Sequence, residues 1–245
     1  MTATPAPARL YLFPTATAML SLGGRSVAWS AGCYLIQLSD GRNLLVDSGP
    51  PPDFSFGSGM PPVAHGPNVI DRLAGLGLEP GDIDVLICSH FDIDHVGYHA
   101  AFTNAELVVQ RAHHAAARDG HPRFAMSRPH WDLPGRQYRL IDGDAELLPG
   151  LRLIATSGHV PGHQSVLVRL PNTGPVLLAI DAVAMAFVFT PERPPMPWLD
   201  EDQPALVAST QTLIDLVATD DVALVVFHHD GAQWERLKRA PDWYD

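Results

Sequence analysis

The sequence predicts an α+β fold in which two packed β-sheets carry helices on their outer faces. Three observations lead to this fold class: a β-rich opening third, later strand patterns that alternate with helical ones, and no break in composition along the chain. Sheets that bury one face against each other and cover the other with helices satisfy this order of elements. With 245 residues, 46% of them hydrophobic, we predict a single domain over residues 1–245.

The opening third predicts three antiparallel strands. Leu10–Phe13 and Trp29–Leu38 are apolar runs with β-type residues. Leu44–Gly49 returns along the second run after the turn Ser39–Asn43, where Gly41 can adopt a positive φ.

Two irregular segments are expected to wall a pocket. Residues 50–67 are rich in Pro and Gly, so they cannot form a regular element, and loops of this length in compact domains are commonly functional. Because this segment leaves the end of a strand, we predict that it forms a lid or a pocket wall. Asp119–Gly135 is predicted as a second wall.

Three helices are predicted, since apolar or Ala residues recur at helical spacing, and the tail after Asp230 is predicted to be short and helical. Asn68–Leu76 begins at a capping Asn, Arg111–Arg118 is Ala-rich, and Ala205–Val217 follows a Pro-rich connector over Pro191–Pro204. The remaining predicted strands are Ile83–Cys88, Ala105–Gln110, the two sides of a turn within Leu147–Thr156, Gln164–Leu170, Val176–Ile180 and Val222–Phe227.

Composition argues against several classes of partner. The formal net charge of −11 disfavours nucleic-acid phosphates and anionic lipid surfaces. No apolar run approaches the ~18 residues of a membrane span, and Met1–Arg9 lacks the pattern of a signal peptide. Cys33 and Cys88 lie in apolar runs and are expected to be buried thiols in a reducing compartment. We therefore expect a cytoplasmic protein whose partner is a small molecule.

Metal-capable side chains gather at the ends of predicted strands. The stretch from His90 to His95 holds four of them within six residues, directly after a buried strand. Loops at one end of a sheet converge, so these side chains can share one site. Two divalent ions about 3.5–4 Å apart can share a bridging hydroxide, and imidazole and carboxylate ligands suit such ions. The other strand-end candidates are Asp47, His159, Asp181 and His229.

These motifs resemble the metallo-β-lactamase superfamily and, within it, the N-acyl homoserine lactonases. The family motif His-x-His-x-Asp-His appears here as His-x-Asp-x-Asp-His, and the lactonase Phe-Gly-His-Asp appears as Phe-His-His-Asp. The resemblance extends from about Arg9 to Trp243. Its main segments are His90–His95, Thr156–Ser165, Ile180–Ala182 and Phe227–Asp230.

The resemblance implies a four-layer αββα sandwich with a metal site at one rim of the sheets. It implies two divalent ions per chain, with zinc expected and manganese or iron allowed by Asp92. It also implies that a metal-bridging hydroxide opens a lactone, with Asp94 as catalytic proton shuttle. The implied ligands are His90, Asp92 and His159 for the first ion, Asp94, His95 and His229 for the second, and Asp181 between the two.

Two positions depart from the family pattern. Asp92 stands where the family has His, which adds a negative charge and a hard oxygen. The alternative is that Asp92 turns away from the first ion and leaves it weakly held. Ala184 stands where the family has a catalytic Tyr, three residues after the bridging Asp.

Other polar residues near these motifs receive supporting roles. His163 is predicted to fix its own loop by hydrogen bonding, and His228 to neighbour the ligand His229. Asp47 is interpreted as a hydrogen-bonding support rather than a ligand. His113 and His114 are expected to be solvated on a polar helix.

Several functions compete on this ligand set. One is a thioesterase of the glyoxalase II type, or another ester or phosphoester hydrolase. A second is a di-iron redox protein, because flavodiiron enzymes carry a carboxylate at the position of Asp92, although this chain is too short for their flavodoxin-like domain. A non-catalytic binding module is a third alternative. The sequence leaves a homodimer open.

Overall fold

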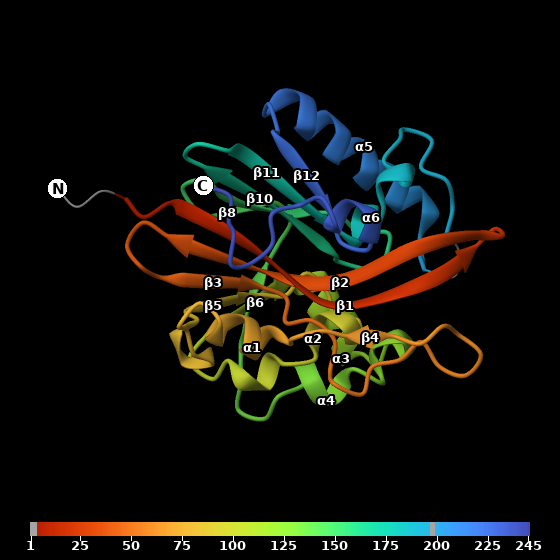
Figure 1. The fold of residues 1–245 in the computed structure, drawn as a ribbon, viewed down its shortest axis with the longest axis horizontal. Helices are drawn as coiled ribbons and strands as arrows, with labels where there is room; N and C mark the ends of the chain where they lie inside the picture. The colour runs from red at the N-terminus through yellow and green to blue at the C-terminus, as the bar shows by residue number, and fades with distance from the viewer. Residues whose placement is uncertain (1–3, 197–198) are drawn as a thin grey trace.

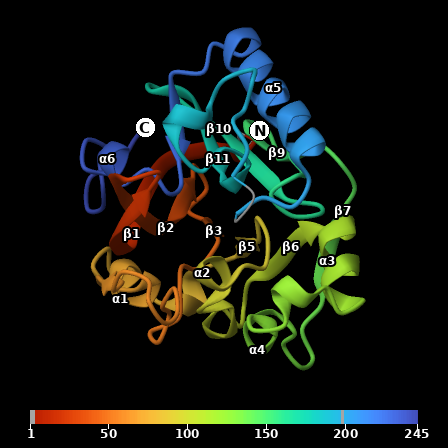
Figure 2. The same cartoon turned by 90° about the vertical axis from the view of Figure 1, so that its right-hand side faces the viewer.

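The computed structural model describes residues 4–196 and 199–245. Two β-sheets stack face to face, with α5 on one side and α1 to α4 on the other (Figures 1 and 2). The predicted α+β class and αββα layering are therefore confirmed. Residues 197 and 198 of the predicted Pro-rich connector lie outside the described residues.

The first sheet has seven strands in the order β4-β1-β2-β3-β5-β6-β7. Strands β4 to β3 pair antiparallel, as predicted for the opening third, and β3, β5, β6 and β7 pair parallel. The bounds are β1 Pro7–Leu22, β2 Arg25–Leu38, β3 Asn43–Val46, β4 Ala64–His65, β5 Val85–Ile87, β6 Glu106–Gln110 and β7 Tyr138–Ile141.

The second sheet has five strands in the order β12-β11-β10-β9-β8. The predicted hairpin of β10 and β11 forms, with Val168 opposite Val176. Among the described strands of this sheet, β11 and β12 pair parallel and the other neighbours pair antiparallel. The bounds are β8 Ala145–Leu148, β9 Leu151–Ala155, β10 Gln164–Leu170, β11 Gly174–Ile180 and β12 Leu224–Phe227.

Helices α1 to α4 cover the outer face of the first sheet and α5 that of the second, whereas Trp234 of α6 packs into the cluster between the sheets. Asn68 caps α1 as predicted, because its side chain accepts from the backbone N–H groups of Ile70 and Asp71. In the described part of the chain, no helix combines the length and apolar character needed to cross a bilayer. The bounds are α1 Val69–Ala74, α2 Ile93–Val96, α3 Arg111–Arg118, α4 Arg128–Trp131, α5 Gln203–Thr219 and α6 Gly231–Trp234.

Three of the four apolar clusters in the described residues pack one layer against another. The largest lies between the sheets and joins β1, β2 and β3 to β9, β10 and β11, for example through Leu12, Ile36 and Val166. A second cluster packs the helices after β3 onto the first sheet. A third packs α5 onto the second sheet through residues such as Leu213. Burying apolar side chains on both faces of each sheet is the main stabilising contribution of such a fold.

The first hairpin is much longer than the sequence predicts. Strand β1 continues from the predicted Leu10–Phe13 through Pro14 to Leu22. The pairing register shifts between Pro14 and Ala16, which lets a residue without a backbone N–H sit inside a paired strand. Strand β7 was not predicted either. The prediction that residues 50–67 form no regular element is wrong at Ala64–His65, which pair with β1 as the short strand β4. The second segment predicted as irregular contains the short helix α4.

Candidate metal centre

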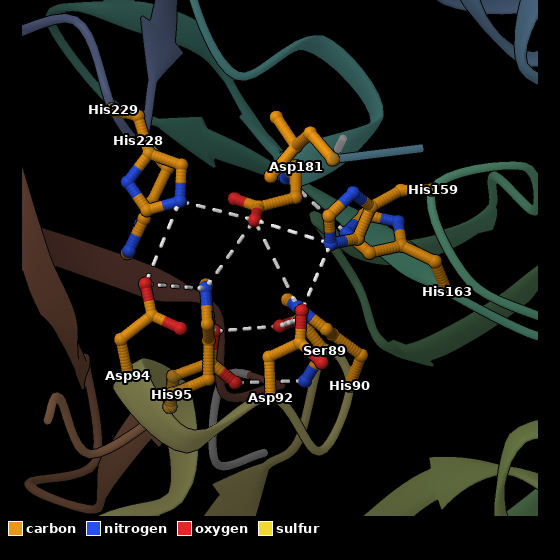
Figure 3. A network of polar contacts seen from close by, with 12 residues as sticks. Ser89, His90, Asp92, Asp94, His95, His159, His163, Asp181, His228 and His229 are labelled. Atoms are coloured by element: carbon orange, nitrogen blue, oxygen red, sulfur yellow. Dashed lines mark hydrogen bonds and ion pairs between the residues drawn. The ribbon is translucent and has the colours of Figure 1, made fainter. Parts of the chain in front are cut away.

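The site lies where the ends of both sheets meet (Figure 3). The first sheet supplies the loop that follows β5 and continues into α2, the segment from His90 to His95. The second sheet supplies His159 between β9 and β10, Asp181 directly after β11, and His229 shortly after β12. The sequence prediction that these strand ends converge is confirmed.

Four imidazoles surround one carboxylate oxygen. Their Nε2 atoms point to Oδ2 of Asp181, which is 1% exposed (Figure 3). The distances to this oxygen are 3.1 Å from His229, 3.4 Å from His159, 3.6 Å from His95 and 3.8 Å from His90. Such separations are close to the roughly 3.4 Å expected between two ligand atoms that each lie about 2.1 Å from one tetrahedral ion.

Each of these imidazoles is oriented by a hydrogen bond at Nδ1. When Nδ1 is engaged by an acceptor, Nε2 carries the free lone pair that a metal requires. The partners are Asp47 Oδ2 for His95 at 2.9 Å, Ser89 Oγ for His90 at 3.0 Å, Asp200 Oδ1 for His159 at 3.2 Å and the Ser30 carbonyl for His229 at 2.7 Å.

Unsatisfied atoms at this centre fit divalent ions. Nε2 of His90, Nε2 of His95 and Oδ1 of Asp181 are buried and find no hydrogen-bond partner among the described residues. Leaving such atoms unpaired is costly, whereas a metal ion satisfies them. Two groups have ligand atoms within 4.8 Å of one another: His90, His159 and Asp181, and His95, Asp181, His228 and His229.

Asp92 and Asp94 lie beside these two groups. Asp92 Oδ2 is 3.4 Å from Nε2 of His90 and 3.2 Å from Nε2 of His159. Asp94 Oδ2 is 3.6 Å from Nε2 of His229. The expected alternative, in which Asp92 turns away from the centre, is not the arrangement observed.

The two carboxyl groups have opposite pKa shifts. Burial would raise the pKa of Asp92, but hydrogen bonds to His159 and His90 hold it well below its ordinary value. Burial raises the pKa of Asp94, and the neighbouring imidazoles only partly oppose this. The shifts therefore favour the ionised form of Asp92 and make protonation of Asp94 easier.

The predicted support roles of Asp47 and His163 are confirmed. Asp47 accepts from the Ser89 backbone N–H at 2.8 Å and from its hydroxyl at 2.6 Å, and its Oδ2 also orients His95. His163 contacts Thr156 Oγ1 at 2.9 Å, and its Nε2 accepts from the backbone N–H of Asp181 at 3.2 Å. Both residues fix the backbone on which the central side chains are carried.

His228 lies beside His229 as predicted, within the second group of possible ligands. It is fully buried, with Nδ1 2.9 Å from the Tyr34 hydroxyl and no partner for Nε2 in the described structure. Its ring stacks on His95 with 4.4 Å between ring centroids.

The expectation that His113 and His114 are solvated is wrong. His113 is fully buried, and its Nε2 accepts from the Phe91 backbone N–H at 2.8 Å. Its Nδ1 donates to the Pro161 carbonyl at 2.7 Å. His113 thus joins the loop after β5 to the loop that carries His159, and these long-range contacts outweigh the polar character of α3. His114 is half-buried.

Three functional candidates escaped the sequence analysis. Arg123 forms a bidentate ion pair with Asp92, and Asp200 orients His159 while pairing with the buried Arg193 at 3.1 Å. Both arginines lie in irregular segments without strand or helix periodicity. The only available signal was the prediction that Asp119–Gly135, which contains Arg123, walls a pocket.

A pocket of about 250 Å³ opens above the centre. Its floor includes Asp94, Asp181 and His229. Both predicted walls are confirmed, since residues 50–67 and 119–135 each contribute side chains. The remaining lining residues are Trp29, Phe54, Phe56, Asp92, Ile93, Arg123, Met126, Ser127 and Leu199.

Ala184 brings no polar group to this pocket. Its side chain is fully buried in an apolar cluster with Trp29, Ala16 and Met185. Its backbone carbonyl accepts from the His229 N–H at 2.9 Å. Ala184 therefore supports the backbone of His229 and offers no counterpart to the family tyrosine.

The fold and the His/Asp centre define a metal-dependent hydrolase class. Residues 28–229 match the family model described as the metallo-beta-lactamase superfamily, so this chain belongs to that superfamily. The resemblance stated from the sequence motifs is thereby confirmed.

The relatives narrow the comparison to lactonases. An N-acyl homoserine lactonase from Bacillus sp is 31% identical over 254 residues, which cover 96% of this chain and 98% of the relative. The N-acyl homoserine lactonase AttM from Rhizobium radiobacter is 34% identical over 71% of this chain and 68% of its own length. A solved N-acyl homoserine lactone hydrolase with N-hexanoyl-L-homoserine bound at its catalytic metal centre superposes with a TM-score of 0.85 at 28% identity, covering 98% of this chain and 100% of its own.

We predict that His113 makes the protein lose stability in mild acid. Burial, the leading cause, lowers the pKa of His113 to about 4. Between about pH 6.5 and 4 the unfolded chain binds a proton at this residue and the folded chain does not, so stability falls with pH by up to about 3 kcal/mol. Urea unfolding of metal-free protein across this range measures the effect.

His113→Gln removes this titration and keeps a polar side chain. The unfolding free energy of the variant should be lower than that of the parent near pH 7.5, and the gap should shrink towards pH 4. A gap that stays constant with pH would show that His113 does not titrate as predicted. His65→Gln, at an exposed position in β4, is the matched control.

Proposed function

We propose that this chain is a metal-dependent hydrolase that opens the lactone ring of N-acyl homoserine lactones, and so acts in quorum quenching. The observation that carries the proposal is the convergence of four imidazole Nε2 atoms on Asp181 Oδ2, beneath a pocket with an apolar wall. Relatives that match nearly the whole chain are N-acyl homoserine lactonases. This favours lactones over the thioesters and phosphoesters considered from the sequence.

The proposed ligands follow the two groups of side chains. When bound, two divalent ions supply Lewis acidity and an activated water nucleophile. Three carboxylates with four imidazoles suit zinc, and the hard oxygen of Asp92 also admits manganese or iron. We assign His90, Asp92 and His159 to the first ion, Asp94, His95 and His229 to the second, and Asp181 to both.

Asp94 is the proposed proton shuttle. Its carboxyl lines the pocket floor, and burial raises its pKa, which favours the protonated form that a proton donor requires. Ring opening breaks the bond between the carbonyl carbon and the ring oxygen, which leaves as an alkoxide. Proton transfer from Asp94 to that oxygen makes it a competent leaving group.

The pocket wall is suited to an acyl chain. Trp29 packs edge-on against Phe56, with 4.9 Å between ring centroids, and stacks on His229 at 5.0 Å. Phe54 and Leu199 complete an apolar surface next to the polar floor. Ala184 has no hydroxyl that could polarise the substrate carbonyl. The pocket lining contains two polar side chains outside the proposed ligand set that could contact the substrate, Arg123 and Ser127.

Other expectations from the sequence stay predictions. These are the single domain over residues 1–245, the identity of the metals, the cytoplasmic location, the homodimer, and the exclusion of nucleic acids and anionic lipids as partners.

Removal of metal is expected to abolish lactone hydrolysis. Protein stripped with a chelator should be inactive on N-hexanoyl homoserine lactone, and addition of zinc or manganese should restore activity. The acid released on ring opening can be followed with a pH indicator. Metal analysis of the same samples should show about two ions per active chain.

A substrate panel separates the rival hydrolases. Metal-loaded protein should hydrolyse lactones at least a hundredfold faster, in kcat/KM, than an acyl thioester or a phosphodiester. Thioester or phosphodiester hydrolysis without lactone hydrolysis would rule out the lactonase assignment. Oxygen consumption by iron-loaded protein without hydrolysis would support the redox alternative instead.

Asp94→Asn should lower kcat for oxygen lactones by about 10²- to 10⁴-fold, because Asn cannot deliver a proton. The kcat for a thiolactone of the same acyl chain should fall much less, since the departing thiol has a pKa of about 8.5 and can leave as a thiolate without protonation. Equal losses on both substrates, with metal content reduced, would show that Asp94 acts only as a ligand.

Phe56→Ala should change the dependence on acyl-chain length. Half-burial of a phenyl ring against a ten-carbon chain contributes on the order of 1–2 kcal/mol, so kcat/KM for that substrate should fall roughly tenfold. A four-carbon substrate should change little. The control is Met60→Ala in the same loop, where the side chain is 52% exposed. Equal losses for both chain lengths would place the acyl chain elsewhere.

A further inference from the structure

Arg123 makes more contacts with the metal centre than any other cationic side chain of the described structure. It lies in the 3₁₀ turn Pro122–Phe124, within the wall of the pocket. Its Nε donates to Asp92 Oδ1 at 2.8 Å and to Oδ2 at 3.0 Å, and its Nη2 donates to Oδ2 at 2.5 Å. This is the bidentate geometry in which guanidinium and carboxylate interact most strongly.

The same guanidinium reaches a second side chain of the first ion. Nη2 of Arg123 lies 3.0 Å from Nε2 of His159, the atom that faces Asp181. Nη1 donates to the Leu199 carbonyl at 2.7 Å, and Glu201 Oε1 is 3.6 Å from Nη1. Arg123 is therefore anchored on both sides, with two of the three proposed ligands specific to the first ion within its hydrogen-bonding range.

Charge is distributed unequally over the two halves of the centre. In the described residues, no Arg or Lys side chain forms a hydrogen bond or ion pair with Asp94, His95 or His229. Each half has one carboxylate of its own, Asp92 or Asp94, and only the carboxylate that replaces the family's imidazole is paired with an arginine. A carboxylate with a bound guanidinium carries the same net charge as a neutral imidazole, which is the group that the family motif has at position 92.

We propose that Arg123 is the charge partner of Asp92, and that it weakens binding of the first ion relative to the second. Two effects act in the same direction. The guanidinium draws electron density from Asp92 Oδ2 and from the lone pair of His159 Nε2, and its positive charge repels a nearby dication. The inference rests on the proposed metal centre but not on the identity of the substrate.

A purely structural role for Arg123 predicts the opposite signs. If the arginine only holds Asp92 in place, its removal makes this ligand more mobile and weakens binding of the first ion. Replacing Asp92 by His would then give a better zinc ligand and tighter binding. If Arg123 is a charge partner, its removal strengthens binding of the first ion. Asp92→His then leaves an unpaired guanidinium beside that ion and weakens its binding.

The test is a metal titration of four forms of the full chain. Metal-free wild type, Arg123→Gln, Asp92→His and the double variant are titrated with zinc and with manganese against a chromophoric chelator. We expect two unequal sites in the wild type. The dissociation constant of the weaker site should fall at least tenfold in Arg123→Gln, rise at least tenfold in Asp92→His, and return to within about threefold of wild type in the double variant.

Two further variants control the interpretation. Arg123→Lys keeps the charge without the bidentate geometry, and its weaker site should stay within about fivefold of wild type. Arg128→Gln removes an exposed arginine five residues away that pairs with Asp132, and it should leave both sites unchanged. Circular dichroism shows whether each variant is folded. If Arg123→Gln is unfolded, the direction of the change in metal affinity of Asp92→His still distinguishes the two roles.

Weaker or unchanged binding of the first ion in Arg123→Gln would overturn the proposal, as would tighter binding in Asp92→His. Wild type that binds no metal would overturn both this inference and the proposed function. Wild type that binds two ions with the expected signs but hydrolyses no lactone would overturn only the proposed function.

Discussion

The metal centre depends on the hydrogen bonds that occupy the Nδ1 atoms of four histidines. A free imidazole can rotate and can present either nitrogen, so four of them would rarely agree on one point in space. Here each ring is held by an acceptor from a different part of the chain: a buried carboxylate, a hydroxyl, a carboxylate backed by an arginine, and a backbone carbonyl. With these acceptors in place, all four Nε2 atoms face Asp181.

Much of the fold and most of the centre could be predicted from the sequence, because both leave local patterns. Strands such as Ile83–Cys88 show as apolar runs, and the central side chains directly follow them. The supporting roles of Asp47 and His163 were also predictable, since both residues lie at recognisable strand ends. The long first hairpin was not, because Pro14 and the small residues after it do not look like a paired strand.

The site residues that were not predicted from the sequence lie far along the chain from their partners. Arg123 is 31 positions from Asp92, and Asp200 is 41 positions from His159. Their roles arise only when irregular loops fold over the sheet ends, and irregular loops have no periodicity to reveal which side chain points inward. His113 was missed for another reason: it lies on a predicted helix, and its polar position is buried through distant partners at Phe91 and Pro161. In the sequence, Asp92 is an isolated departure from the family motif, because no local pattern indicates that Arg123 is its charge partner.

The origin of the ligands in two different sheets has a mechanical consequence. Half of the centre follows β5, whereas His159, Asp181 and His229 follow strands of the other sheet. Bound ions would therefore act as a cross-link between the two sheets, in addition to the apolar core that joins them. Separation of the sheets would require release of metal, so metal supply would govern the lifetime of the folded protein as well as its chemistry. Under metal scarcity, loss of activity and susceptibility to proteolysis should then arise together, as two effects of one opening event.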